Sequence, residues 1–99
     1  KMVKRKIVWT SKAKNQLFDI LEYFIFRNKS KIYSQKLYQK IQSELLPLIH
    51  QPNIGKKTNT INVRGIFIEN YFIFYETNEN HIIILSVWDT RQNPNRLRF

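Results

Sequence analysis

Residues 70–94 read NYFIFYETNENHIIILSVWDTRQNP, and this stretch decides the fold of the chain. Two apolar runs, residues 71–76 and 81–88, flank the polar segment 77–80, which predicts two antiparallel strands joined by a tight turn. The second run contains Ile-Ile-Ile-Leu without a polar break, which is typical of a central strand covered on both faces. This strand leads directly into a turn that contains Arg91, so we expect a rigidly held arginine at the surface.

A third strand is predicted just before this pair, at residues 60–68, with a turn at Glu69 and Asn70 between them. Successive side chains of a strand point to opposite faces of the sheet. One face then holds Ile61, Val63, Gly65 and Phe67. The opposite face holds Asn62, Arg64, Ile66 and Ile68. Residues 60–88 therefore form a predicted three-stranded antiparallel meander, which follows a polar connector at residues 56–59.

The first half of the chain predicts one short strand and two helices. Residues 4–9 are the strand candidate, and the hydroxyl of Thr10 or Ser11 can cap the helix that follows. The apolar stripe of this helix consists of Ala13, Leu17, Ile20, Leu21, Phe24 and Ile25. The second helix starts near Ser30, and its predicted inner face consists of Tyr33, Leu37, Ile41, Leu45 and Leu48. Pro47 lacks a backbone donor and should kink or end this helix just before it. So short a break between two helices predicts an antiparallel helical hairpin.

Three aromatic residues of the first helix, Phe18, Tyr23 and Phe26, fall off its apolar stripe. A helix with such a second face packs on two sides or presents a surface that another chain covers. The helical hairpin can cover one face of the predicted sheet. The other face would then need a partner.

The whole pattern predicts an α+β fold in a single domain over residues 1–99. It consists of an N-terminal strand, an antiparallel helical hairpin and a three-stranded antiparallel meander, in one sheet with the helices packed on one face. The chain is 42% hydrophobic, which is enough to build a core.

The absence of cysteine excludes disulfides, thiolate metal sites and cysteine nucleophiles. No pattern with metal-ligand spacing and no cofactor motif is present, so we expect no metal and no cofactor. Without an apolar run of membrane-spanning length or a signal peptide, we expect a cytoplasmic protein with no membrane partner.

The net charge of +10 is distributed unevenly. Residues 1–57 hold 13 Lys and Arg against 3 Asp and Glu, whereas residues 58–99 hold 4 of each kind. Such a field favours an anionic partner, either nucleic acid or an acidic protein, although it also suits a solvated helix face. Most of the excess is lysine, which reads bases poorly compared with arginine, so an acidic protein is at least as plausible as nucleic acid.

The predicted order of elements resembles the RelE/ParE family of bacterial toxins over nearly the whole chain. The segments that carry the resemblance are Thr10-Ser11-Lys12-Ala13, Pro52-Asn53-Ile54-Gly55, Val63-Arg64-Gly65, Asn70-Tyr71-Phe72-Ile73-Phe74-Tyr75 and Ile84-Leu85-Ser86-Val87-Trp88-Asp89-Thr90-Arg91. The resemblance implies the toxin of a type II toxin–antitoxin system. Such a toxin is neutralised by a small acidic antitoxin in a hetero-oligomeric complex.

Two activities diverge within that family, and the resemblance is closer to ParE than to RelE. RelE-like members cleave messenger RNA in the ribosome and usually carry an arginine just after an aromatic residue of the third strand. Here Phe72 follows Tyr71, and Leu97-Arg98-Phe99 offers no C-terminal tyrosine. ParE-like members act instead on DNA gyrase. The alternatives are a ribosome-dependent endoribonuclease and a non-toxic member that serves only as a binding module.

The resemblance and the charge pattern together single out a small set of site residues. Arg91 and Arg64 are the candidates for contact with the target or an anion, and a ribonuclease would add Lys56 and Lys57. For Arg91 the competing interpretation is an ion pair with Asp89 that braces the turn. For Arg64 it is an edge-strand side chain that faces water, and for the lysines it is simple solvation. The predicted antitoxin-binding residues are Phe18, Tyr23, Phe26, Phe72 and Phe74. We expect Tyr75 and Trp88 in the core, and His50 and His81 in non-catalytic positions.

Overall fold

The computed structural model describes residues 4–91, and it confirms the predicted α+β class. The elements, in chain order, are β1 (Lys6–Trp9), α1 (Ser11–Asn28), α2 (Ile32–Leu45), the 3₁₀ helices η1 (Leu46–Ile49) and η2 (Pro52–Ile54), and strands β2 (Lys56–Lys57), β3 (Val63–Ile68), β4 (Tyr71–Thr77) and β5 (His81–Asp89). Within residues 4–91, neither helix is long and apolar enough to cross a membrane.

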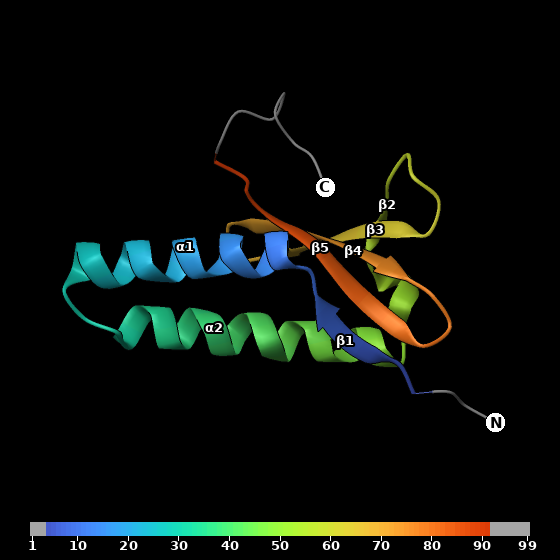
Figure 1. Cartoon of the computed structure of the whole chain (residues 1–99), viewed down its shortest axis with the longest axis horizontal. Helices are drawn as coiled ribbons and strands as arrows, with labels where there is room; N and C mark the ends of the chain where they lie inside the picture. Colours follow the sequence, from blue (N-terminus) through green and yellow to red (C-terminus); the bar gives the residue numbers. More distant parts are fainter. Residues whose placement is uncertain (1–3, 92–99) are drawn as a thin grey trace.

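All five strands form one mixed sheet in the order β1-β5-β4-β3-β2, with the helices on one of its faces (Figure 1). β3, β4 and β5 are antiparallel neighbours, as the meander prediction requires, and β5 is an interior strand. β1 adds to the other side of β5 in parallel, with Ile7 opposite Ile82. The N-terminal strand therefore depends on residues more than 70 positions away in the sequence.

The segment before β3 differs from its prediction. Residues 56–59 were expected as a polar connector, but Lys56 and Lys57 pair with β3 as a short edge strand. The predicted strand at 60–68 begins only at Val63, because the residues before it form a turn. In this turn the Val63 amide donates to the carbonyl oxygen of Thr60 at 3.2 Å, and Asn62 has a left-handed φ of 65°.

The helix boundaries follow from local chemistry. The Thr10 hydroxyl accepts the Ala13 amide at 3.1 Å and caps α1, which confirms the first of the two predicted caps. α2 ends at Leu45, two residues before Pro47, and the chain continues as η1. One predicted inner position of α2 is wrong, because Tyr33 is 40% exposed. Ser34 is buried beside it, since its hydroxyl donates to the Leu21 carbonyl oxygen at 2.7 Å and ties the two helices together.

The core lies between the helical hairpin and one face of the sheet. Its buried side chains include Ala13, Leu17, Leu37, Ile41, Leu45, Leu48, Ile68, Tyr71, Ile73, Tyr75, Ile82, Ile84 and Val87. Trp9 and Ile66 are partly buried and pack against this cluster. On the opposite face, the Phe72 ring covers Gly65 so closely that a Cβ atom there would overlap it. That contact explains why a glycine stands in the middle of β3.

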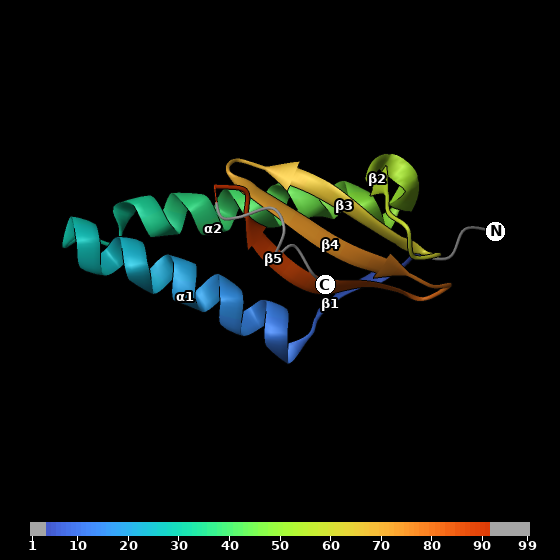
Figure 2. The same cartoon turned by 90° about the horizontal axis from the view of Figure 1, so that it is seen from above.

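The helical hairpin is longer than the sheet it covers. Figures 1 and 2 show that the turn between α1 and α2 projects well beyond the ends of the strands. Apolar residues near this tip therefore have no sheet beneath them. Phe26 is 85% exposed and Ile32 is 63% exposed.

Candidate functional site

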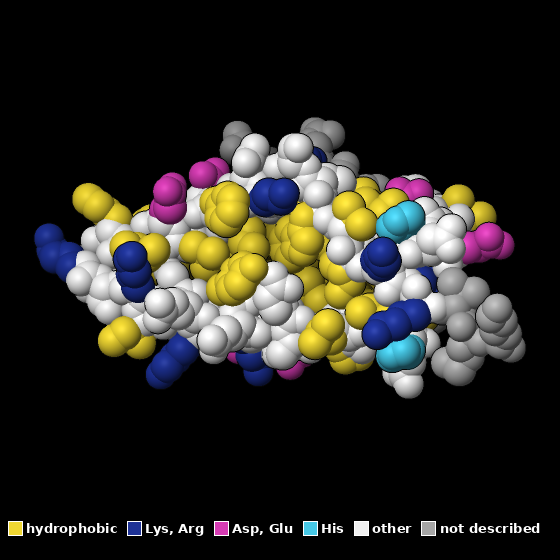
Figure 3. Space-filling view, turned by 60° about the horizontal axis from the view of Figure 1, so that its bottom comes forward, with side chains coloured by type: hydrophobic (Ala, Val, Ile, Leu, Met, Phe, Trp, Pro, Cys, Tyr) yellow, Lys and Arg dark blue, Asp and Glu magenta, His cyan; other side chains and the backbone are white. Residues whose placement is uncertain are grey.

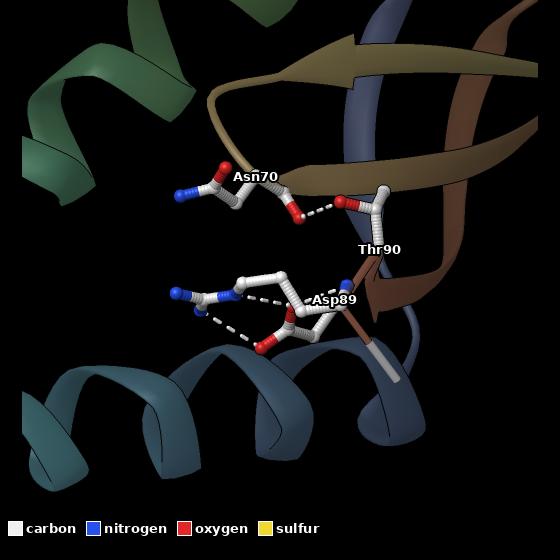
Figure 4. Close-up of polar contacts among 4 residues, drawn as sticks. Asn70, Asp89 and Thr90 are labelled. Atoms are coloured by element: carbon white, nitrogen blue, oxygen red, sulfur yellow. Dashed lines mark hydrogen bonds and ion pairs between the residues drawn. The ribbon is translucent and has the colours of Figure 1, made fainter. Parts of the chain in front are cut away.

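The turn after β5 holds Arg91 in a fixed position. Asp89, the last residue of β5, is paired with Tyr71 of β4. The Thr90 hydroxyl and amide both donate to the Asn70 carbonyl oxygen, at 2.8 and 2.9 Å, and tie the turn to the β3–β4 hairpin (Figure 4). The Arg91 guanidinium donates to both carboxylate oxygens of Asp89, each at 2.9 Å, and its backbone amide donates to one of them at the same distance. The predicted ion pair between Arg91 and Asp89 is therefore present and braces the turn.

Arg91 can still contact a binding partner while it is paired with Asp89. The Arg91 side chain remains 54% exposed, whereas that of Asp89 is only 24% exposed. A guanidinium carries five N–H donors in a rigid fork, so those that face neither Asp89 nor the Tyr71 hydroxyl stay available for an acceptor. The ion pair and a role in target contact are compatible, and the pair would preorganise the contact.

Proton affinities around the turn suit binding rather than proton transfer. The hydrogen bond from Arg91 holds the pKa of the Asp89 carboxyl below its usual range, and it raises the pKa of Arg91 itself. Burial raises the pKa of the Tyr71 hydroxyl, although Arg91 partly opposes that shift. At neutral pH Asp89 is thus a weak base, Tyr71 is a neutral phenol and Arg91 is a cation. These three groups do not provide a poised acid–base pair.

A cleft of about 540 Å³ opens beside this turn, between α1 and the end of β5. Its walls include Gln16, Asp19, Ile20, Tyr23, Phe24 and Arg27 of α1, with Tyr71, Trp88, Asp89 and Arg91 of the sheet and its turn. The Gln16 side-chain amide oxygen accepts a hydrogen bond from the Val87 backbone amide at 2.7 Å, and this bond ties α1 to β5. The mixture of aromatic walls with two acidic and two basic groups suits a short peptide segment or a large side chain of a partner.

Arg64 lies at the other end of the sheet. Arg64 is opposite Tyr75 of β4, whereas Asp89 is opposite Tyr71, the first residue of that strand and four residues before Tyr75. The expectation that Arg64 faces water from an edge strand is wrong, because β2 lies outside β3 and Arg64 is half-buried. Its guanidinium donates to the Gly55 carbonyl oxygen at 2.9 Å.

The turn that Arg64 contacts is fixed from a second side by Tyr75. The Tyr75 hydroxyl donates to the Pro52 carbonyl oxygen at 2.7 Å and accepts the Gly55 amide at 3.0 Å. This buried network explains the spacing of Pro52 and Gly55, and it confirms Tyr75 as a core residue. Trp88 was also predicted in the core, but it is half-buried and lines the cleft.

The groups that a ribonuclease would use do not converge on one point. Lys57 is opposite Arg64, and the Lys56 ammonium lies 5.1 Å from the centre of the exposed Phe67 ring. Both lysines are therefore near Arg64 and far along the sheet from Arg91. His50 is exposed on the segment after η1, and His81 opens β5. Within residues 4–91 no group of acidic or histidine side chains has the arrangement of a metal site.

The predicted antitoxin-binding residues fall into two groups. Phe18, Tyr23 and Phe26 are 51%, 56% and 85% exposed and lie along the outer side of α1. Phe72 is half-buried on the sheet face away from the helices, and Phe74 is only 3% exposed. Direct contact of a partner with Phe74 would thus need a rearrangement. Phe67, which sequence reasoning passed over, is 53% exposed and packs against Phe72 with ring centres 4.5 Å apart. Its alternation along β3 with the partly buried Ile66 and the buried Ile68 is the signal that would have found it.

Known proteins share this architecture and sequence pattern. Residues 7–94 match the family described as the ParE toxin of the type II toxin–antitoxin system parDE. The chain belongs to the ParE toxin family. The fold of this ParE-family chain is also that of a solved structure, the chromosomal ParDE toxin–antitoxin system from P. aeruginosa. The similarity has a TM-score of 0.73 at 20% sequence identity and covers 87% of this chain and 96% of the other. No functionally curated protein sequence matches the chain.

Family membership confirms the resemblance drawn from the sequence. The match spans β1 to the segment after β5, so it includes the Arg91 turn, the cleft and the Pro52–Gly55 turn. Residues 92–99, where a C-terminal tyrosine was sought, lie outside the described residues.

Proposed function

We propose that this chain is the toxin of a ParE-type toxin–antitoxin pair and that it inhibits growth by protein contact with DNA gyrase. The observation that carries the proposal is the Arg91 turn. It presents a braced, permanently charged guanidinium beside an aromatic cleft, yet its neighbours Asp89 and Tyr71 have pKa values shifted away from the range that proton transfer at neutral pH requires. A rigid arginine next to an aromatic pocket is typical of a binding hot spot.

A cognate antitoxin is the second partner in this proposal. The outer side of α1 exposes Phe18, Tyr23 and Phe26, and the half of the chain that contains them carries the whole net charge of +10. Figure 3 shows hydrophobic side chains gathered on one face of the molecule with Lys and Arg side chains among and around them. A small acidic polypeptide with an apolar face would bury these aromatics and pair with the cations.

The antitoxin would neutralise the toxin by covering the cleft beside Arg91. Tyr23 belongs to both surfaces, because it is exposed on the outer side of α1 and also lines the cleft beside Arg91. An antitoxin segment that crosses Tyr23 would cover the mouth of the cleft. Gyrase and antitoxin would therefore compete for the same surface rather than bind at separate sites.

The experiment that tests the antitoxin proposal begins with the neighbouring gene. A short acidic reading frame beside this one should yield a complex on co-expression and relieve the growth arrest caused by this chain alone. Phe26→Ser should weaken capture by at least about tenfold, because it removes an aromatic anchor without disturbing the core. Phe67→Ser removes an aromatic that is 53% exposed on the sheet face away from the helices, and it should leave capture unchanged if the antitoxin surface is confined to α1. A chain that is harmless alone and captures no acidic partner would contradict the proposal.

A further inference from the structure

A second cavity lies at the end of the sheet opposite the Arg91 turn. Its volume is about 570 Å³, and the loop at residues 58–62 and the β4–β5 turn form much of its wall. Three cationic side chains line it, from Arg5, Lys57 and Arg64, against one carboxylate, Glu79. The cavity therefore has an excess of two positive charges. It shares no residue with the cleft beside Arg91.

The two arginines are held in place rather than free in solvent. Arg64 donates to the Gly55 carbonyl oxygen at 2.9 Å, and Arg5 donates through its Nε to the Asn78 carbonyl oxygen at 2.8 Å. Each of these two contacts engages one N–H of a fork that has five. Both guanidiniums are thus oriented by the backbone and keep donors for a ligand, which reduces the entropy lost on binding.

The wall of the cavity contains a residue with a polar atom that has no partner. The Thr77 hydroxyl oxygen is buried and makes no hydrogen bond with the described residues 4–91, although the Thr77 amide donates to the Asn62 carbonyl oxygen at 3.0 Å. Buried hydroxyls are nearly always hydrogen-bonded, and an unsatisfied one calls for an explanation. Because this oxygen has almost no accessible surface, a ligand atom in the cavity would satisfy it only after the Thr77 side chain turned toward the cavity. The Asn53 and Asn62 side chains line the same space.

We propose that this cavity binds a tetrahedral oxyanion of the phosphate class. The guanidiniums of Arg5 and Arg64 and the Lys57 ammonium would neutralise it, and the Thr77 hydroxyl, once turned toward the cavity, would donate to one of its oxygens. Guanidinium forks match the spacing of phosphate oxygens, and charge-assisted hydrogen bonds of this type are the strong ones. The phosphate is either a small free anion or a backbone phosphate of a nucleic acid. The site is independent of the gyrase proposal, since it lies at the other end of the sheet.

The test uses the full chain and inorganic phosphate as the probe, followed by ¹H–¹⁵N NMR. Phosphate should shift the backbone amide signals around Thr77, Asn62 and Lys57 in a saturable way, whereas sodium chloride at equal ionic strength should not. Thr77→Val keeps the shape of the side chain and removes only the orphan hydroxyl. We expect this variant to be at least as stable as the parent and to bind phosphate about tenfold more weakly. Lys57→Gln should also weaken binding, and Lys36→Gln, which removes a lysine from the exposed side of α2, should not.

Competition identifies the source of the phosphate. A single-stranded oligonucleotide without terminal phosphates displaces inorganic phosphate if the site takes a backbone phosphate, and it fails to do so if the site takes a small free anion. The proposal is overturned if the phosphate shifts are absent or do not saturate. It is equally overturned if Thr77→Val and Lys57→Gln titrate like the parent chain, because the effect would then be general charge screening.

Discussion

Arg91 has two possible roles, bracing the turn through Asp89 and contacting the target, and replacement with alanine separates them. The structure limits how much the ion pair can contribute to the free energy of unfolding. The Arg91–Asp89 pair is bidentate, but the arginine is 54% exposed, and exposed pairs stabilise proteins by about 0.2–1 kcal/mol. In a domain of this size 1 kcal/mol corresponds to roughly 4–8 °C in Tm. Arg91→Ala should therefore lower Tm by at most about 8 °C and leave the chain folded at 37 °C.

The effect of Arg91→Ala on function should be much larger. Loss of a hot-spot arginine at an interface costs about 2 kcal/mol or more, which is about 30-fold in affinity. We expect a comparable increase in the concentration that half-inhibits gyrase supercoiling, and a loss of growth arrest at equal expression. Tm by circular dichroism, growth after induction and supercoiling are to be measured on the same preparations.

Asp89→Ala is the matched control, since it breaks the same ion pair and keeps the cation. If Arg91 contacts the target, Asp89→Ala should retain more inhibition than Arg91→Ala. If Arg91 only braces the turn, the two variants should lose stability and toxicity equally. A third outcome, an Arg91→Ala chain that melts like the parent and remains fully toxic, would remove Arg91 from the site.

Two further predictions concern stability. Tyr75→Phe removes the hydroxyl that bonds Pro52 and Gly55 and leaves the buried Gly55 amide unpaired, so the free energy of unfolding should fall by about 1–3 kcal/mol; an unchanged Tm in thermal denaturation would show that the network does not hold this turn. The lowered pKa of Asp89 means that its ion pair stabilises the chain above the ordinary aspartate pKa of about 3.9 and that this contribution is lost as pH falls through the lower folded-state pKa. The Tm difference between the parent chain and Asp89→Asn should thus be present at pH 7 and shrink as the pH falls below about 3.9, and a difference that stays unchanged throughout that acid titration would refute the assignment.

Local signals account for the parts of the fold that the sequence predicted. The cap at Thr10, the stop before Pro47 and the turn at Glu69 each depend on residues within a few positions, so their chemistry is readable from the chain. The Asp89–Arg91 pair is local for the same reason. The apolar runs of β4 and β5 likewise indicate strands in the interior of the sheet, where the structure places them.

Long-range contacts account for what the sequence did not predict. The parallel pairing of β1 with β5 joins Ile7 to Ile82, and no local pattern reports it. The two-residue strand β2 contains only lysines, so it has no apolar alternation to reveal it. Arg64 was expected to face water, because nothing in its neighbourhood shows that β2 lies outside β3 or that the Gly55 carbonyl oxygen would accept its hydrogen bond.

We propose that the chain acts by protein contact on gyrase and does not cut RNA. The most direct measurement exposes purified gyrase and, in parallel, translating ribosomes to the purified chain and to Arg91→Ala. We expect the parent chain to inhibit supercoiling or trap gyrase on cleaved DNA, with a strong loss in Arg91→Ala, while ribosome-bound messenger RNA stays intact. Codon-phased cuts in that messenger RNA, absent with Arg91→Ala and accompanied by unaffected gyrase, would contradict the claim and establish the ribonuclease instead.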